Sequence, residues 1–169
     1  MSLDRPIRVR PAQEADLPGI ASIGSESFSG LRPLAAATRW VHACWAAHPR
    51  MRYWVAEQGG TPTAYILWME KGGFRSEAVV ELEQIAVHPS LRGQGVGGEL
   101  IRASLAQLTR SIESEGRRVK VIEVTTGSEQ GAVEFYRRVL GAEVVATIPG
   151  LFRGVEFILV ARPNSASSP

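Results

Sequence analysis

The chain has 169 residues, 44% of them hydrophobic and 21% charged, which suits one globular domain with a full-sized core. Its formal net charge of +2 is too small to indicate nucleic-acid binding, and no run of about 18 apolar residues could span a membrane. The single cysteine, Cys44, excludes an intramolecular disulfide and a multi-cysteine metal site. We therefore expect a cytoplasmic protein that binds no metal, no nucleic acid and no membrane.

The first half of the chain predicts a strand, two helices and a hairpin. Residues 7–12 are strand-like, and the next segment has helical apolar spacing with Asp16 as its cap. Residues 31–49 predict a second helix that a proline ends. Residues 53–70 predict two strands joined by the Gly59–Gly60 turn.

The second half alternates strands and helices before a final pair of strands. Strands are expected at residues 78–89 and 118–126, an amphipathic helix at 95–115 and a short helix at 131–140. Residues 142–163 predict two strands around a Pro-Gly turn. The order β-α-α-β-β-β-α-β-α-β-β predicts a mixed α/β fold. We expect one domain at residues 5–163 and a disordered tail at 164–169.

A glycine-rich loop, residues 93–98, lies between a predicted strand and a predicted helix, where backbone N–H groups can face a phosphate. A P-loop is excluded because Glu99 stands where its lysine belongs. Three of the glycines also match a dinucleotide fingerprint, with Glu123 as the ribose contact. That match is weak, because five residues separate Val87 from the first glycine and Glu123 lies inside a strand-like run.

Coenzyme A fits the same loop better. Residues 92–97, Arg-Gly-Gln-Gly-Val-Gly, match the pattern Arg/Gln-x-x-Gly-x-Gly/Ala. Glycine lets the backbone approach a pyrophosphate closely, and Arg92 adds a positive charge. A helix start with no ligand is the alternative, but so many glycines would then raise the entropy cost of folding without benefit.

These residues give the chain its resemblance to a known family. Residues 82–101, LEQIAVHPSLRGQGVGGELI, resemble the acyl-coenzyme A signature of the GNAT N-acetyltransferase superfamily. Residues 132–142, AVEFYRRVLGA, resemble its second signature, and residues 7–20 and 53–68 resemble its opening strand and helix and its central hairpin. The resemblance implies a central, mostly antiparallel twisted sheet flanked by helices. It also implies transfer of an acetyl group from acetyl-coenzyme A directly to a primary amine.

The general base is expected on the strand at residues 78–89. Alternation places Glu81 and Glu83 on one face, together with Ile85 and Val87. Burial and mutual repulsion would raise the pKa of one of these carboxylates toward neutrality, as a base requires. The resemblance also points to an acidic residue on this strand and leaves both positions tenable. The alternative is a solvated strand face, or carboxylates that bind a cationic substrate.

Further roles follow from the resemblance alone. It implies that Tyr136 is the general acid for the departing thiolate, and its place off the apolar stripe of its helix predicts that it faces a cleft. Glu129 stands where the family has Asn, which leaves Ser128 or Glu129 as the replacement. A bulge at residues 85–87 is expected to part this strand from its neighbour. The implied cofactor contacts are Ile85, Ala86, Val87, Arg92, Gly93, Gln94, Gly95, Val96, Gly97, Gly98, Ser128 and Tyr136.

The acceptor side is less defined. The resemblance places it on the early helices and last strands, whose aromatic residues include the four tryptophans, although core packing is the simpler interpretation for each. Small-molecule and peptide amines both remain candidates, and the chain is expected to be a monomer or a homodimer. A non-catalytic acyl-coenzyme A sensor and a dinucleotide-binding protein are the rival functions.

Overall fold

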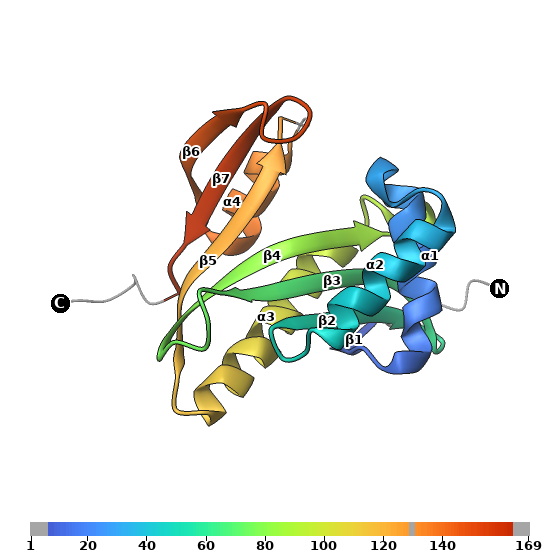
Figure 1. Cartoon of the computed structure of the whole chain (residues 1–169), viewed down its shortest axis with the longest axis horizontal. Coiled ribbons are helices and arrows are strands. Elements are labelled where there is room, and N and C mark those ends of the chain that lie inside the picture. The colour runs from blue at the N-terminus through green and yellow to red at the C-terminus, as the bar shows by residue number, and fades with distance from the viewer. Residues whose placement is uncertain (1–6, 129–130, 164–169) are drawn as a thin grey trace. The chain divides into compact units, whose positions relative to one another are not determined.

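The structure, a computed structural model, describes residues 7–128 and 131–163 (Figure 1). The element order agrees with the one expected from the sequence. The predicted tail at 164–169, residues 5–6 of the expected domain, and Glu129 lie outside the described residues. The elements are β1 (Arg8–Pro11), α1 (Leu17–Ser27), α2 (Leu34–Ala46), β2 (Met51–Gln58), β3 (Thr61–Lys71), β4 (Glu77–Val87), α3 (Val96–Ser114), β5 (Arg118–Gly127), α4 (Ala132–Leu140), β6 (Glu143–Pro149) and β7 (Val155–Ala161).

The strands form a seven-stranded sheet in the order β1-β2-β3-β4-β5-β7-β6. β1 pairs antiparallel with β2, and β7 pairs antiparallel with both β5 and β6. β4 and β5 pair in parallel, because α3 connects them as a crossover helix. The predicted mixed, mostly antiparallel sheet with flanking helices is confirmed.

The chain forms two compact units, and β3 and β4 each contribute to both. Unit 1 comprises residues up to Trp68 together with Gln84–Leu105, and unit 2 comprises Met69–Glu83 together with residues from Ala106 onward. Among the described residues, no helix has the length and apolar character needed to cross a bilayer.

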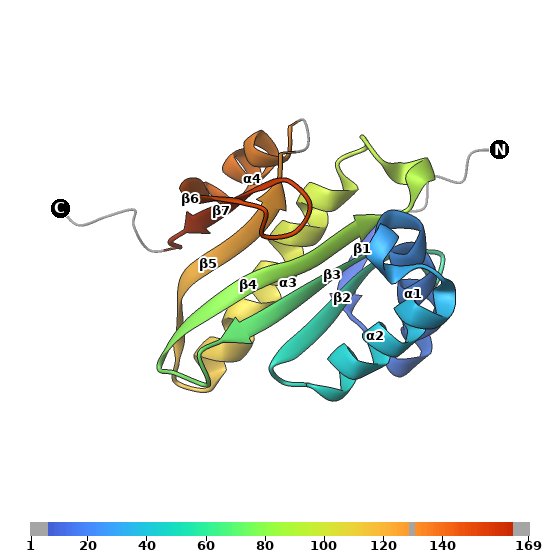
Figure 2. The same cartoon turned by 45° about the horizontal axis from the view of Figure 1, so that its top comes forward.

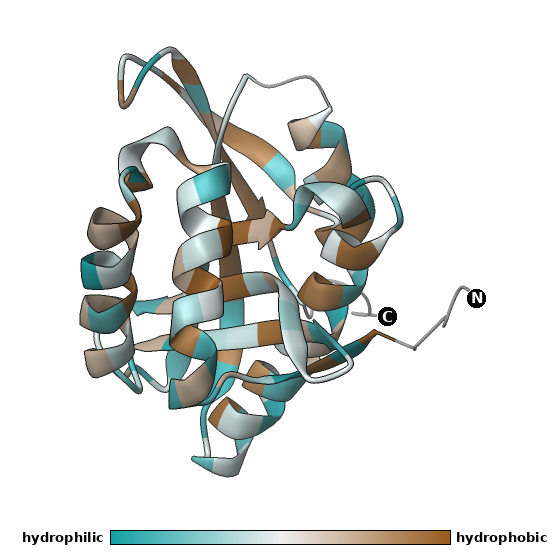
Figure 3. Ribbon diagram, turned by 90° about the vertical axis from the view of Figure 1, so that its right-hand side faces the viewer, coloured by the Kyte–Doolittle hydropathy of each residue, from teal (hydrophilic) through white to brown (hydrophobic). Residues whose placement is uncertain are grey.

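Unit 1 buries its strands between helices on two sides. α1 and α2 lie side by side (Figure 2) and share one core cluster with Tyr53, Val55 and Tyr65 of the strands. On the opposite face, the buried Trp68 indole donates a 2.9 Å hydrogen bond to Oγ of Ser104 in α3. Figure 3 shows the resulting pattern, with hydrophobic stretches along the strands and mixed hydropathy on the helices.

The two faces of the unit 2 strands differ in how deeply their side chains are buried. The face with Leu82, Val124 and Leu159 is buried, and α4 packs on β5 and β7. Residues between these, such as Glu81 and Glu123, are only partly buried. Successive side chains of a strand point to opposite faces, so this pattern marks a second, more accessible face of the unit 2 strands.

Asp16 stands at the predicted N-cap position of α1, but its side chain does not make the capping hydrogen bond that was expected. Its carboxylate accepts hydrogen bonds from the Arg10 guanidinium at 2.7 and 3.0 Å and from the Gln13 N–H at 2.7 Å. The Arg10 hydrogen bonds hold the pKa of Asp16 below its usual value. A charged partner from β1 therefore outcompetes the helix terminus for this carboxylate.

Candidate functional site

The glycine loop is open and adopts backbone conformations that favour glycine. Gly93 and Gly95 have φ values of 75° and 82°, and a Cβ atom built on either would meet nothing within 4 Å. α3 begins directly after them, at Val96. The first N–H groups of a helix lack intrahelical acceptors and carry the positive end of its dipole. The loop can therefore hold a phosphate group against exposed amides.

The Arg92 side chain makes hydrogen bonds that connect the glycine loop to neighbouring elements. Its Nε donates a 3.0 Å hydrogen bond to the carbonyl of Val87, and Nη2 lies 3.4 Å from Oγ of Ser27. At the other end of the loop, Gln94 donates to the Ser90 carbonyl at 2.9 Å. These contacts fix the loop to the end of β4 and to α1, so its amides are held in place before any ligand binds.

The predicted β4 alternation is present. Ala78, Val80, Leu82 and Ala86 are buried, whereas Glu81, Glu83, Ile85 and Val87 are partly exposed. The β4–β5 pairing extends from Glu77–Arg118 to Leu82–Val124, and its register shift lies at Ala78/Val79. This pairing ends before residues 85–87, and the bulge that the resemblance places there stays a prediction.

Two residues from neighbouring strands, Glu123 and Lys71, contact or face the carboxylates of β4. Glu81 is paired in register with Glu123 of β5, so the two side chains share a face. The Lys71 ammonium at the end of β3 lies 3.2 Å from Oε2 of Glu81 and 2.8 Å from Oε1 of Glu123. Burial alone would lower the pKa of Lys71, but hydrogen bonds to the two carboxylates raise it. Lys71 is therefore charged and neutralises part of this cluster.

Glu83 differs from Glu81 in its electrostatics. Burial raises the pKa of Glu83, and repulsion from Glu81 raises it further, while the Lys71 charge opposes both effects. A carboxyl group with a raised pKa accepts a proton more readily near neutral pH than an ordinary one. Of the two candidates, Glu83 therefore has the properties of a general base.

Tyr136 lies on the buried side of α4. It is the buried residue of α4, with 9% of its surface exposed, whereas Phe135 is only half-buried. The two rings meet edge to face with centroids 5.2 Å apart. α4 therefore turns its Tyr136 side inward, and the expectation that Tyr136 faces a cleft stays a prediction.

Ser128 is exposed at the end of β5. It lines an open pocket of about 410 Å³ together with Val133 and Arg137 of α4 and Phe157 of β7. Arg137 supplies a cationic side chain there. A hydroxyl group and a guanidinium group in one pocket suit an anionic ligand.

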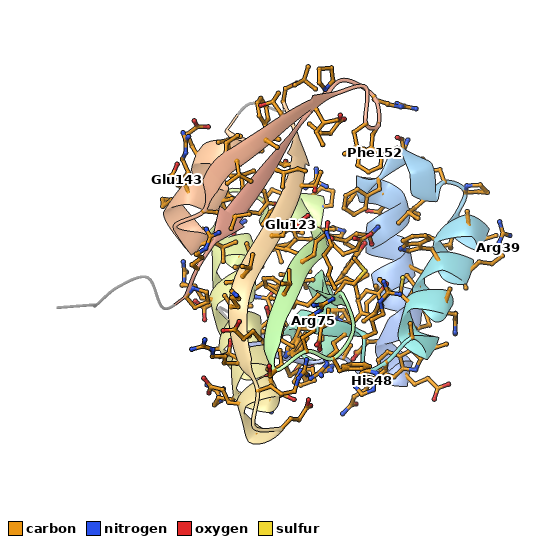
Figure 4. The ribbon with its side chains drawn as sticks, turned by 60° about the vertical axis from the view of Figure 1, so that its left-hand side comes forward. Arg39, His48, Arg75, Glu123, Glu143 and Phe152 are labelled. Atoms are coloured by element: carbon orange, nitrogen blue, oxygen red, sulfur yellow. The ribbon has the colours of Figure 1, made fainter. Side chains whose placement is uncertain are left out.

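The tryptophans divide into core and surface residues. Trp54 and Trp68 have 4% and 1% of their surfaces exposed and belong to the core, as the simpler interpretation predicted. Trp40 is 40% exposed. Phe152 lies in the turn between β6 and β7 and is 74% exposed (Figure 4), which makes it the more accessible aromatic candidate for an acceptor contact.

Three site residues escaped the sequence reasoning: Lys71, Glu123 as a member of the acidic cluster, and Glu156. Glu123 is engaged by Lys71 in mid-strand, which argues against the ribose contact of the dinucleotide hypothesis. Glu156 is 5% exposed on β7. A charged residue inside the apolar run of residues 155–161 was the available signal for it. Within the described ranges, no group of three or more His, Cys, Asp and Glu side chains could hold a metal ion.

Comparison with known proteins identifies the relatives of this chain. An uncharacterised N-acetyltransferase of Methanocaldococcus jannaschii is 32% identical over 111 residues, which are 63% of this chain and 45% of that protein. The chain thus spans under half of this relative. The ribosomal-protein-S18-alanine N-acetyltransferase of Escherichia coli has a TM-score of 0.71 at 19% identity, covering 96% of this chain and 97% of the other. NAA60 of Arabidopsis thaliana, solved with acetyl-CoA, has a TM-score of 0.73 at 13% identity, covering 94% and 99%.

The two structural matches establish a shared fold, in agreement with the strand order described above. The acetyltransferase (GNAT) family profile matches residues 18–142, which run from the first turn of α1 through the central hairpin and the glycine loop to the end of α4. With both predicted signatures inside the matched region, the chain belongs to the acetyltransferase (GNAT) family.

Proposed function

We propose that this protein is an acetyl-CoA-dependent N-acetyltransferase that acts on a primary amine by direct transfer. The observation that carries the proposal is the make-up of β4 and the loop after it. One continuous segment holds a half-buried carboxylate with a raised pKa, Glu83, and then an exposed loop in which Gly93 and Gly95 leave open space beside the backbone.

The loop residues suit the pyrophosphate of coenzyme A. Gly93 and Gly95 leave the space beside their backbone open, and the N-terminus of α3 favours an anion. Main-chain groups of Ile85, Ala86 and Val87 would pair with the extended pantetheine arm as a neighbouring strand does. Bound acetyl-CoA supplies an acetyl group activated as a thioester.

Glu83 and Tyr136 would handle the protons of the transfer. Glu83 takes a proton from the acceptor ammonium, directly or through a water molecule, which frees the nitrogen lone pair. A carbon–nitrogen bond then forms, and the carbon–sulfur bond breaks. Tyr136 donates its phenolic proton to the departing sulfur, and water returns a proton to the phenol. The products are the amide and free coenzyme A.

The first test is release of free thiol from acetyl-CoA with a panel of amines, peptides and aminoglycosides, combined with calorimetric titration of acetyl-CoA. Thiol release with one acceptor class would support the proposal and identify the type of substrate. Binding of acetyl-CoA without thiol release across the panel would favour a non-catalytic acyl-CoA sensor. Absence of both binding and release would overturn the proposal.

A further inference from the structure

The accessible face of the unit 2 strands also carries the carboxylate of Glu156. β7 pairs with β5 so that Glu156 lies opposite Gly127, Ile158 opposite Thr125, and Val160 opposite Glu123. Residues opposite one another in an antiparallel pair share a face. Glu156 therefore points to the same side of the sheet as Glu123. Through the Glu81–Glu123 pairing, it also shares that side with Glu81 and Glu83.

The environment of Glu156 is unusual for a carboxylate. The residue is only 5% exposed, and its Oε1 accepts a 3.3 Å hydrogen bond from the N–H of Arg153. Its other oxygen, Oε2, is buried and has no hydrogen-bond partner among the described residues. A buried carboxylate oxygen without a donor is costly, so such an atom commonly marks the place of a missing partner.

The space beside Glu156 can admit that partner. Gly127, its register neighbour on β5, has no side chain, and a Cβ atom built there would meet nothing within 4 Å. This space, the opening over Gly127, lies by strand alternation on the face that carries Thr125 and Glu123. By strand geometry, Glu156 lies roughly 14 Å from Glu123, since four residues along a strand span about 13 Å and neighbouring strands are about 5 Å apart.

We propose that Glu156 binds a second cationic group of the acceptor, so that the substrate is an elongated amine with at least two positive charges. This inference rests on the proposed function and extends it to a substrate class. One ammonium of the acceptor is presented to Glu83 for reaction. The distal ammonium or guanidinium donates to Oε2 of Glu156, through the opening over Gly127. A charge-assisted hydrogen bond of this kind satisfies the buried oxygen.

The test compares α,ω-diamines from diaminobutane to diaminooctane with the monoamines of equal length, as acceptors in the thiol-release assay. We expect kcat/KM for the best diamine to exceed that of its matched monoamine by about tenfold or more, with an optimum chain length. In Glu156→Gln this ratio falls close to one. The amide keeps an oxygen for the Arg153 N–H, so the turn contact is preserved while the charge is removed.

Two further variants separate binding from folding. Gly127→Ala places a methyl group in the opening without altering any charge, and it too lowers the diamine advantage. Glu143→Gln removes a carboxylate at the exposed start of β6, and it retains the wild-type ratio. A Glu156→Gln variant with the wild-type diamine preference, or wild-type enzyme that treats diamines and monoamines alike, overturns the inference while leaving the proposed activity intact.

Calorimetric titration of the diamines tests the Glu156 cation site separately from the proposed acetyltransferase activity. If no amine releases thiol, the proposed activity fails, but calorimetric titration of the same diamines still tests Glu156. Diamine binding that Glu156→Gln weakens by about tenfold supports the cation site. Equal affinities in the wild type and the variant overturn it.

Discussion

The Lys71 ammonium donates a 2.8 Å hydrogen bond to Oε1 of Glu123 across the accessible face of unit 2. The same nitrogen lies 3.2 Å from Glu81, so one cation serves two carboxylates. Its charge also lowers the pKa of Glu83 against the raising effects of burial and of Glu81. Lys71 thus lowers the pH at which Glu83, the proposed base, ionises.

Replacing Lys71 with methionine should move the acidic limb of the pH profile upward. Without the ammonium, nothing offsets the two effects that raise the pKa of Glu83, so a higher pH is needed to ionise it. Below that pKa the base is protonated and kcat/KM falls as the pH decreases. The measurement is kcat/KM for thiol release against pH, because this parameter reports the free enzyme. Lys71→Arg keeps the charge and should keep the limb near its wild-type position.

Glu83→Gln should reduce turnover and stabilise the fold at neutral pH. Loss of a general base typically lowers kcat by about 10²- to 10⁴-fold. The pKa of Glu83 is raised in the folded state above its ordinary 4.5, so the folded state holds the proton more tightly than the unfolded chain. Stability therefore falls as the pH rises from about 4.5 through the raised pKa, and an uncharged amide avoids that loss. Calorimetric Tm values at acidic and neutral pH test this.

Glu81→Gln is the matched control for this pair. Glu81 makes an ion pair with Lys71, so its removal should bring no comparable gain in Tm. If Glu81→Gln, rather than Glu83→Gln, abolishes turnover, the base is Glu81 and the assignment from electrostatics is wrong.

Tyr136→Phe should lower kcat by about 10²-fold with little change in the Kd for acetyl-CoA. Phenylalanine has the shape of the buried ring and can keep the edge-to-face contact with Phe135, so the fold should tolerate it. Single-turnover thiol release and calorimetric titration measure the two parameters separately. Unchanged turnover would remove Tyr136 from the mechanism, and a weakened Kd would instead indicate a binding role.

Local patterns predicted the parts of the structure that depend on neighbours in sequence. The alternation along residues 78–89 placed Glu81 and Glu83 on one face because strand side chains have a period of two. Likewise, Gly59–Gly60 marked the hairpin turn, where both glycines have positive φ values of 64° and 86°. Each of these features is determined within a few residues of the chain.

The features that escaped prediction depend on cross-strand register. Lys71 meets Glu123, which is distant in sequence, because β3, β4 and β5 are adjacent in the sheet. Glu156 joins their face through the β5–β7 pairing. A single sequence carries little information on register, since a shift of one residue would turn every side chain to the other face.

Gly95→Ala should weaken acetyl-CoA binding by more than its effect on stability explains. Gly95 has a φ of 82°, where an alanine is strained by about 1–2 kcal/mol, although its Cβ would meet nothing within 4 Å. The proposed pyrophosphate would contact the backbone at this point, so a methyl group also obstructs the ligand. Gly73 of the β3–β4 turn has a φ of 80° and equally open surroundings, which makes Gly73→Ala a matched control for strain.

The two alanine variants should therefore lower the Tm to a similar extent but differ in affinity. Calorimetric titration should show a Kd for acetyl-CoA raised by about tenfold or more in Gly95→Ala, because a phosphate held by backbone N–H groups tolerates no displacement of the loop. Gly73→Ala should bind acetyl-CoA as the wild type does. Equal affinities in both variants would show that the loop at residues 93–98 does not hold the cofactor, and the assignment of its glycines would have to be abandoned.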